Sequence, residues 1–157
     1  MVTAGAQLSS LKAYLQTPDQ MEETFEKLWD IGYRIVQLQW INPEISPETI
    51  AVALKRSGLK SVSTQDYYQE VVSRLDSTLR LHELCGSKNI CVSGIPEQFL
   101  TEKGCLAFAG ELTDFALRMQ EVGKVVSFHP RVQEYRRFGG RSGVEILMEN
   151  TPHVLQL

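Results

Sequence analysis

The chain reads Gly32-Tyr-Arg-Ile-Val-Gln-Leu-Gln-Trp40 where a helical pattern gives way, through a glycine, to a short apolar strand. The same joint recurs at three later places, which are Gly58-Leu-Lys-Ser-Val-Ser-Thr64, Gly86-Ser-Lys-Asn-Ile-Cys-Val-Ser93 and Gly123-Lys-Val-Val-Ser-Phe-His129. Glycine suits this position because it can end a helix in the left-handed conformation without a Cβ penalty. The series therefore predicts an α/β protein built from parallel strand–helix units.

The spacing of these joints favours a barrel. Their glycines lie 26, 28 and 37 residues apart, close to the ~31 residues per unit of an eight-unit barrel of about 250 residues. A parallel series can also open into a doubly wound sheet, but the sequence has no G-x-G-x-x-G after its first strand and no G-x-x-x-x-G-K-[ST]. We therefore predict parallel (β/α) repeats that form a partial or truncated TIM (β/α)8 barrel. Residues 1–157 are expected to be one domain that lacks the last units.

Amphipathic helical patterns separate the joints. Leu112, Phe115, Ala116 and Met119 recur at i, i+3, i+4 and i+7, as expected for a helix that covers one face of a sheet. Ser46-Pro-Glu48 predicts a helix start, because serine accepts from free N–H groups, proline fits the first turn and glutamate favours the positive helix end. Another helix is expected around the apolar positions Tyr68, Val71, Val72, Leu75, Leu79 and Leu84.

The overall composition argues against several classes of function. With a net charge of −3 and a pI near 5.6, the chain has no excess of positive charge for nucleic acid or for anionic lipid. No run of 18 apolar residues occurs, so a membrane-spanning segment is not expected. Cys85, Cys91 and Cys105 are an odd set without a CxxC pair, which disfavours a disulfide framework and a structural zinc site and favours a reducing cytoplasm.

A family resemblance extends from Ala6 to the C-terminus. The segments that carry it, in order, are Ala6-Gln-Leu-Ser-Ser-Leu11 as first strand, Thr24 to Leu38 as helix and second strand, Gly58 to Gln65 as third strand, Val92-Ser-Gly94 on the fourth, Phe128-His-Pro-Arg-Val-Gln-Glu-Tyr135 on the fifth and Gly143 to Thr151 beyond it. In order and spacing they resemble the N-terminal part of the xylose isomerase-like TIM barrels of the sugar phosphate isomerase/epimerase type. That superfamily also includes inosose dehydratases and endonuclease IV-type enzymes.

The resemblance implies a sugar or sugar-phosphate isomerase/epimerase, which moves a proton beside a sugar carbonyl with the help of a divalent metal such as Mn, Mg, Zn or Co. Relatives often show His-Asn-His and a Glu-Phe pair on the fifth strand, where this chain has His129-Pro-Arg131 and Glu134-Tyr135. Their third strand often ends in Ser/Thr-His, where this chain has Thr64-Gln65. Their metal ligands come from the fifth through eighth strands. The resemblance therefore implies His129 as the metal ligand within this chain, and the chain alone is expected to be inactive.

Catalytic candidates follow from the rule that barrel chemistry lies at the carboxyl ends of the strands. His129 ends an apolar run, where an imidazole can act as a general acid/base or as a metal ligand. Glu134 follows five residues later and is the second acid/base candidate. The alternatives are a histidine that hydrogen-bonds a loop carbonyl and a solvated loop glutamate.

Substrate-binding candidates are the polar and aromatic residues beside the strand ends. Arg131 carries the planar fork that grips a carboxylate or phosphate, and Trp40 can stack on a sugar face. The candidates for the hydroxyl groups of a small-molecule sugar or polyol are Gln39, Gln65 and Ser93, with Gln7 and Ser9 as weaker ones at the first strand. The alternative for each is ordinary structural hydrogen bonding or packing, and for Arg131 it is a solvated basic loop.

Three functions stay open from the sequence. The first is the isomerase/epimerase. The second is a catalytically inactive module that keeps a sugar-sized pocket or serves in assembly, with another copy of the chain covering its open sheet edges as a homo-oligomer. The third is DNA repair of the endonuclease IV type, which the negative charge disfavours. An in-frame continuation beyond Leu157 would favour the first function, and a genuine stop would favour the second.

Overall fold

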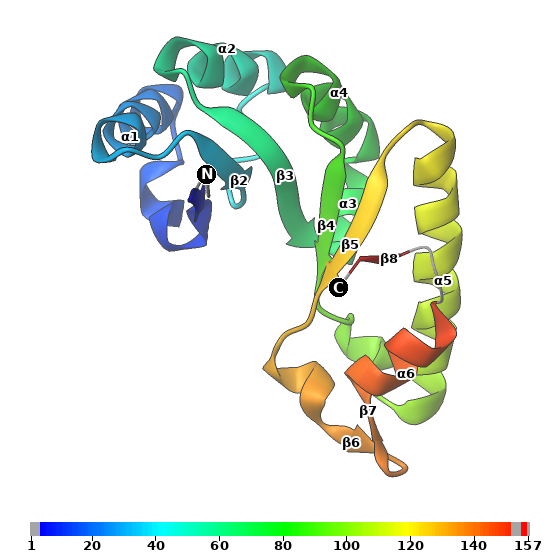
Figure 1. The fold of residues 1–157 in the computed structure, drawn as a ribbon. Coiled ribbons are helices and arrows are strands. Elements are labelled where there is room, and N and C mark those ends of the chain that lie inside the picture. The colour runs from blue at the N-terminus through cyan, green and yellow to red at the C-terminus, as the bar shows by residue number, and fades with distance from the viewer. Residues whose placement is uncertain (1–3, 152–154, 157) are drawn as a thin grey trace. The chain divides into compact units, whose positions relative to one another are not determined.

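Parallel strands alternate with helices along most of the chain in the computed structural model, which describes residues 4–151 and 155–156 (Figure 1). The strands are β1 (Gly5–Gln7), β2 (Ile35–Leu38), β3 (Lys60–Tyr67), β4 (Asn89–Ser93), β5 (Val125–His129), β6 (Arg137–Phe138), β7 (Arg141–Ser142) and β8 (Leu155–Gln156). The α-helices are α1 (Pro18–Ile31), α2 (Pro47–Ser57), α3 (Tyr68–Ser73), α4 (Leu75–Cys85), α5 (Glu102–Glu121) and α6 (Gly143–Asn150). The 3-10 helices are η1 (Leu8–Tyr14), η2 (Glu97–Phe99) and η3 (Val132–Tyr135).

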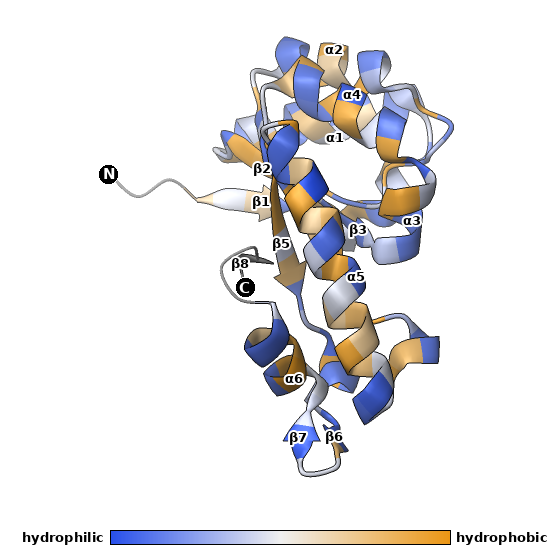
Figure 2. Ribbon diagram, turned by 90° about the vertical axis from the view of Figure 1, so that its right-hand side faces the viewer, coloured by the Kyte–Doolittle hydropathy of each residue, from blue (hydrophilic) through white to orange (hydrophobic). Residues whose placement is uncertain are grey.

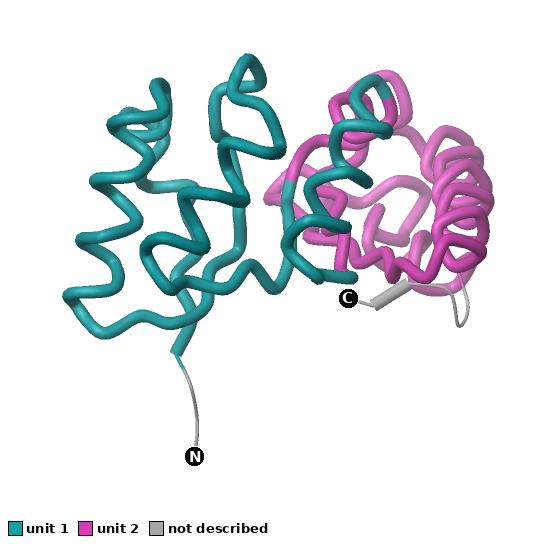
Figure 3. Tube along the Cα trace, turned by 90° about the horizontal axis from the view of Figure 1, so that it is seen from above, with its two compact units in different colours: residues 1–65, 73–88 teal, residues 66–72, 89–157 magenta. Residues whose placement is uncertain are grey.

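These elements group into two compact units by their contacts (Figure 3). The first unit comprises residues 1–65 and 73–88, and the second comprises residues 66–72 and 89–157. The prediction of a single domain over residues 1–157 stays a prediction, and each unit is described by itself below.

The first unit holds the parallel strands β1 and β2 and the part of β3 up to Gln65. In β1 and β2, Gln7 lies opposite Gln37, and in β2 and β3, Leu38 lies opposite Thr64. The register shifts between Val36 and Gln37, where β2 is locally irregular. Because the three strands run in the same direction, their carboxyl ends lie at the same end of this part of the sheet.

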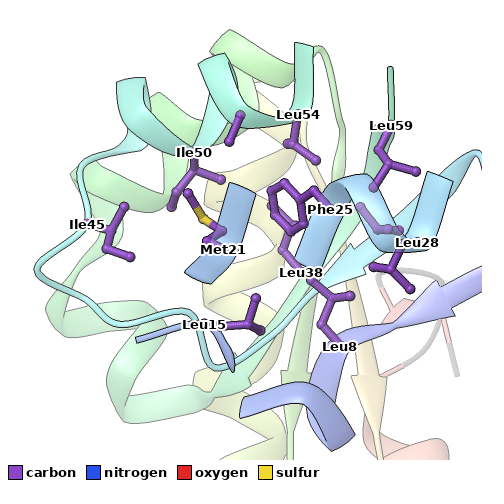
Figure 4. Packing of buried hydrophobic residues seen from close by; sticks show 12 residues of the cluster. Leu8, Leu15, Met21, Phe25, Leu28, Leu38, Ile45, Ile50, Leu54 and Leu59 are labelled. Atoms are coloured by element: carbon purple, nitrogen blue, oxygen red, sulfur yellow. The ribbon is translucent and has the colours of Figure 1, made fainter. Parts of the chain in front are cut away.

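One hydrophobic cluster holds the first unit together (Figure 4). It is formed by residues of η1, α1, β2 and α2 and of the segments beside them, which are Leu8, Leu15, Met21, Phe25, Leu28, Val36, Leu38, Ile45, Ile50, Ala53, Leu54 and Leu59. Met21 and Phe25 of α1 have no exposed surface. Burying a side chain of this kind contributes about 1.5–3 kcal/mol, so the cluster fixes how α1 and α2 lie against β2.

The second unit contains the parallel strands β4, β5 and β8. β4 and β5 pair over their whole length, from Asn89 opposite Val125 to Ser93 opposite His129, and β8 pairs with β5. The long helix α5 packs on β5 and α6 packs on α5. Figure 2 shows hydrophobic and hydrophilic stretches alternating along α5. The apolar positions predicted for this helix are buried, which confirms the pattern: Leu112, Phe115, Ala116 and Met119.

Aromatic rings form the centre of the second unit's packing around Phe108 of α5. The Phe108 ring lies 5.2 Å from the ring of Tyr68 in α3 and 5.5 Å from that of Phe99 in η2, measured between centroids. The ring of Phe128 in β5 is 6.5 Å away. Tyr68 meets Phe108 edge to face, the geometry that the ring quadrupoles favour.

The predicted joints and helix start are confirmed. The four joint glycines have positive φ values between 66° and 115°, and a strand follows each of them: Gly32, Gly58, Gly86 and Gly123. The Oγ of Ser46 accepts a hydrogen bond from the N–H of Thr49 at 3.2 Å at the start of α2. None of the described helices combines the length and the apolar composition that crossing a bilayer requires.

Two predicted elements have different bounds in the structure. The first strand ends at Gln7 and not at Leu11, because the side chain of Gln7 accepts a hydrogen bond from the N–H of Ser9 and the chain turns into η1. The single helix predicted around Tyr68 to Leu84 is two helices, which break at Arg74. Tyr68 of α3 packs on the ring of Phe108 in α5, within the second unit. His82 of α4 hydrogen-bonds to Thr64 of β3, within the first unit.

Candidate functional site

In the first unit, amide side chains lie at the carboxyl ends of all three strands. Gln7 is the last residue of β1, Gln39 follows β2 directly and Gln65 lies near the end of β3. The Nε2 of Gln7 donates a hydrogen bond to Oε1 of Gln39, which is only 5% exposed. The Oε1 of Gln7 in turn accepts from the N–H of Ser9 at 3.0 Å. The bonded pair of Gln7 and Gln39 therefore lies at the end of the strands that TIM barrels use for chemistry.

Trp40, which follows Gln39, has a backbone conformation that is costly for a large side chain. Its φ is +58°, and it is the one residue other than glycine with a positive φ in the part of the chain that the structure describes. The ring is half-buried, and Nζ of Lys12 lies 5.3 Å from its centroid. Such strain costs about 1–3 kcal/mol and is often found at ligand sites. The strain supports Trp40 as a candidate.

In the second unit, Ser93 and His129 end the neighbouring strands β4 and β5 and lie opposite each other in the register. Ser93 is buried, whereas His129 is exposed. The N–H of Gly94 donates a hydrogen bond to the backbone carbonyl of His129 at 3.1 Å, so the two strand ends stay together one residue further. The exposed imidazole of His129 and the buried hydroxyl of Ser93 therefore belong to neighbouring strand ends.

The carboxylate of Glu134 joins the two loops that follow these strands. Its Oε1 accepts a hydrogen bond from the N–H of Ile95 at 2.8 Å, and its Oε2 accepts one from the N–H of Arg131. Glu134 has no exposed surface. Both oxygens are therefore engaged by backbone donors in a buried position, where such bonds are strong. The predicted acid/base role of Glu134 stays a prediction, and the geometry shows a loop-holding role.

Arg131 extends from the loop after β5 onto Tyr67. Its guanidinium carbon lies 5.0 Å from the centroid of the Tyr67 ring, and its Nη1 donates a hydrogen bond to the phenol oxygen. Gly94 makes room for this side chain, because a Cβ at Gly94 would lie 3.0 Å from Cδ of Arg131. A guanidinium has five donors, so several remain for an anion.

The cysteines are poor candidates for a nucleophile. Burial raises the pKa of the thiols of Cys85, Cys91 and Cys105, and at Cys105 the nearby Glu134 carboxylate raises it further. A raised pKa lowers the thiolate fraction at neutral pH, and the thiolate is the reactive form. The candidate site residues therefore remain the predicted imidazole, carboxylate, guanidinium, hydroxyl, amide and indole groups.

A metal centre does not fit the residues that the structure describes. Within 4–151 and 155–156, no group of three or more His, Cys, Asp or Glu side chains is placed to hold a metal ion. His129 would be an isolated ligand, whereas catalytic zinc sites use three protein ligands. The predicted metal-ligand role of His129 stays a prediction.

The structure brings four of the predicted site residues together in the second unit, and these are Ser93, His129, Arg131 and Glu134. The other three, which are Gln39, Trp40 and Gln65, lie at or near the strand ends of the first unit. Sequence reasoning missed Tyr67 and Gly94. A glycine directly after a polar strand end was the available signal for Gly94, while Tyr67 ends β3 as an aromatic residue with no distinctive pattern around it.

The fold defines a class of α/β protein in which parallel strand–helix units carry polar residues at the carboxyl ends of the strands. The structure is similar to a sugar phosphate isomerase/epimerase from Parabacteroides distasonis, with a TM-score of 0.77 and 16% identity over 98% of this chain. It is also similar to the AP endonuclease, family 2, from Brucella melitensis (TM-score 0.68, 16% identity, 99% of this chain). A third similar structure is an L-ribulose 3-epimerase (TM-score 0.63, 13% identity, 99% of this chain).

These similarities confirm the predicted fold resemblance to sugar phosphate isomerase/epimerase and xylose isomerase-like TIM barrel proteins. The chain spans 63% of the length of the Parabacteroides protein, 67% of the Brucella protein and 59% of the epimerase. No family model matches the sequence, and no curated protein is similar to it in sequence. At identities of 13–16% the similarity establishes the fold alone.

Proposed function

We propose that this chain is a sugar phosphate isomerase/epimerase-like protein that binds a sugar or polyol at the carboxyl ends of its parallel strands. One observation carries the proposal: the register that sets Ser93 opposite His129 at one strand end, in a fold shared with sugar isomerases and epimerases. The exposed imidazole of His129 is the group that takes or returns a proton beside the sugar carbonyl.

The other candidates bind and orient the ligand in this proposal. Arg131 holds an anionic end of the substrate with the donors that Tyr67 does not use. In the first unit, Gln39 and Gln65 are the proposed hydroxyl-binding residues and Trp40 is the proposed stacking residue. In the second unit, Ser93 is the proposed hydroxyl-binding residue. Glu134 can act as a second acid/base only when one of its two backbone hydrogen bonds opens.

We expect turnover to require metal ligands that the described residues do not supply. The family resemblance implies a divalent metal (Mn, Mg, Zn or Co) in the complete fold of the superfamily. Such a metal would polarise the sugar oxygens. The described residues offer His129 without companion ligands, so we expect the isolated chain to bind a sugar without converting it and to bind metal weakly.

The test measures binding and turnover separately in the isolated chain. Ketopentoses, ketohexoses and their phosphates are titrated by calorimetry, and turnover is followed as incorporation of solvent deuterium into the sugar by NMR. We expect His129→Ala to weaken sugar binding about fivefold to tenfold, and the exposed Gln98→Ala to leave it unchanged. Stoichiometric binding of Mn²⁺ or Zn²⁺ together with turnover would contradict the expectation that the isolated chain is inactive. Absence of any sugar binding would contradict the proposed function.

An assembly role is the second candidate, because two strands have one described partner each. β1 pairs with β2 and β8 pairs with β5, which leaves each with an open edge in its own unit. A homo-oligomer that covers these edges would elute above the monomer mass in size-exclusion chromatography with light scattering. We place the protein in the cytoplasm because all three cysteines are free, and we expect no nucleic-acid partner because the net charge is −3.

A further inference from the structure

A groove in the first unit lies between α2, the beginning of β3 and the end of α4. Its volume is about 390 Å³, within the range of about 300–1,000 Å³ found for small-molecule sites. Leu54, Leu59 and Cys85 form its apolar interior, and Val52 and Leu84 line it with 46% and 38% of their surfaces exposed. The groove is therefore apolar and open to solvent.

The groove is separate from the candidate sugar site. It includes Lys60 and Ser61, which begin β3, whereas Gln65 lies five residues further along the same strand. Five residues of an extended strand span about 16 Å. A ligand in the groove would therefore lie toward the amino end of β3, and the candidate site residues of this unit lie at the carboxyl end.

The charges around the groove favour an anion. Glu48 is paired with Arg80, whose Nε lies 2.9 Å from its Oε1, and Arg80 also pairs with Glu83. These three groups together carry one negative charge, and the two lysines of the groove outweigh it. Lys55 and Lys60 also line the groove, and neither ammonium group makes an ion pair with any residue that the structure describes. Two unpaired positive charges beside an apolar interior would repel a cation. A neutral apolar ligand would leave both of these charges unused.

We propose that this groove binds a small amphipathic anion, with its apolar body between α2 and α4 and its acidic group beside Lys55 and Lys60. The long stems of the two lysines can cover the apolar body while their ammonium groups meet the acidic group near the solvent. The groove is small for a folded partner, and its volume matches a ligand with one or two rings or a short aliphatic chain.

The test uses two fluorescent probes that have the same aromatic rings and differ by one sulfonate group. The first is 8-anilinonaphthalene-1-sulfonate, and the second is N-phenyl-1-naphthylamine, which has the same rings without the sulfonate. We expect saturable one-to-one binding of the sulfonate and binding of the uncharged probe about fivefold weaker or more. Circular dichroism recorded across the titration checks that the protein stays folded.

Two variants and a matched control locate the probe. Lys55→Gln combined with Lys60→Gln is expected to weaken sulfonate binding about fivefold to tenfold, and Val52→Glu to abolish saturable binding. The control, Lys88→Gln combined with Lys103→Gln, changes the net charge equally at exposed positions that do not line the groove. This control is expected to bind like the unchanged protein.

Alkylation of Cys85 gives an independent readout of occupancy. Burial raises the pKa of this thiol, so iodoacetamide reacts with it slowly, and the bound sulfonate is expected to slow the reaction several-fold further. The proposal is overturned if the folded protein binds neither probe or binds both equally. It is also overturned if the groove and control variants weaken binding alike, or if saturating probe leaves the alkylation of Cys85 unchanged.

Discussion

Glu134 has no solvent-exposed surface, and its carboxylate accepts hydrogen bonds from the N–H groups of Ile95 and Arg131. These donors follow β4 and β5, so one side chain holds two strand-end loops together. Glu134→Ala would leave both donors without their acceptor. We expect it to lower the free energy of unfolding by about 2–4 kcal/mol, measured by urea denaturation.

Two further variants separate the hydrogen bonds from a general effect of removing charge. Glu134→Gln keeps one acceptor oxygen and is expected to cost less than the alanine variant. Glu97→Gln changes an exposed carboxylate and should stay within about 0.5 kcal/mol of the unchanged protein. If Glu134→Ala is as mild as Glu97→Gln, the two loops are held together by other contacts.

Gly94 combines a left-handed backbone with a close neighbour. Its φ is +70°, and an added Cβ would lie 3.0 Å from Cδ of Arg131. We expect Gly94→Ala to cost about 1–2 kcal/mol from the backbone and to displace the Arg131 side chain from Tyr67. Denaturation of the single variants and of the double variant with Arg131→Ala would show a coupling between the two positions.

Gly86→Ala is the matched control for this cycle. Gly86 has a similar φ of +66°, but no atom lies within 4 Å of its added Cβ. Its substitution should therefore show the backbone cost alone. If both substitutions lower the free energy of unfolding equally and neither is coupled to Arg131, the close approach at Gly94 does not contribute to stability.

The sequence predicts where site residues end their strands, but it does not predict which contacts they make. Ser93 and His129 are recognisable because an apolar run ends at each. The bond from Ile95 to Glu134 spans 39 residues and the bond from Arg131 to Tyr67 spans 64, and no local pattern encodes contacts of this separation. The catalytic prediction for Glu134 used its distance along the chain and could not include its burial.

The helix start predicted at Ser46 is confirmed, because capping depends on local sequence. The structure shows the same kind of cap at three starts that were not predicted. Thr17, Ser46, Thr101 and Ser142 each accept a hydrogen bond from an N–H in the first turn of the helix that follows. The break near Arg74 has no such signal, since no glycine or proline interrupts the apolar pattern there. Which unit each half packs against decides that break, and periodicity does not contain this information.

The start of α6 gives a pH-dependent prediction. Hydrogen bonds from the backbone N–H and hydroxyl of Ser142 lower the pKa of the Glu145 carboxyl. A lowered pKa means that this stabilisation is present above the ordinary glutamate pKa of about 4.3 and is lost as the pH falls through the lower folded value.

Comparison with Glu145→Gln measures this contribution. We expect the unchanged protein to be the more stable of the two at about pH 7, and the difference to shrink as the pH falls below about 4. Urea denaturation of both proteins across this range is the measurement. A difference that is constant or that grows in acid would show that the carboxylate is not the stabilising form.

The molecule as a whole follows from a repeat that is visible in the sequence. The glycine joints at Gly32, Gly58, Gly86 and Gly123 are each followed by a strand, and the parallel pairing keeps the strand directions equal within each unit. The division into two units was not predictable, because the boundary falls inside β3, between residues 65 and 66. The repeat looks the same in every strand–helix pair, so it carries no information about which pairs share a hydrophobic core.

The proposed function rests on sugar binding at the carboxyl ends of the parallel strands. It is tested by an NMR titration of the 15N-labelled chain with a ketopentose. We expect saturable shifts at the backbone amides of Gly94, Ile95 and Arg131 in the second unit and of Trp40 in the first, with no change at Lys60. A folded chain without saturable shifts, or one whose shifts gather at the amino ends of the strands, would contradict it.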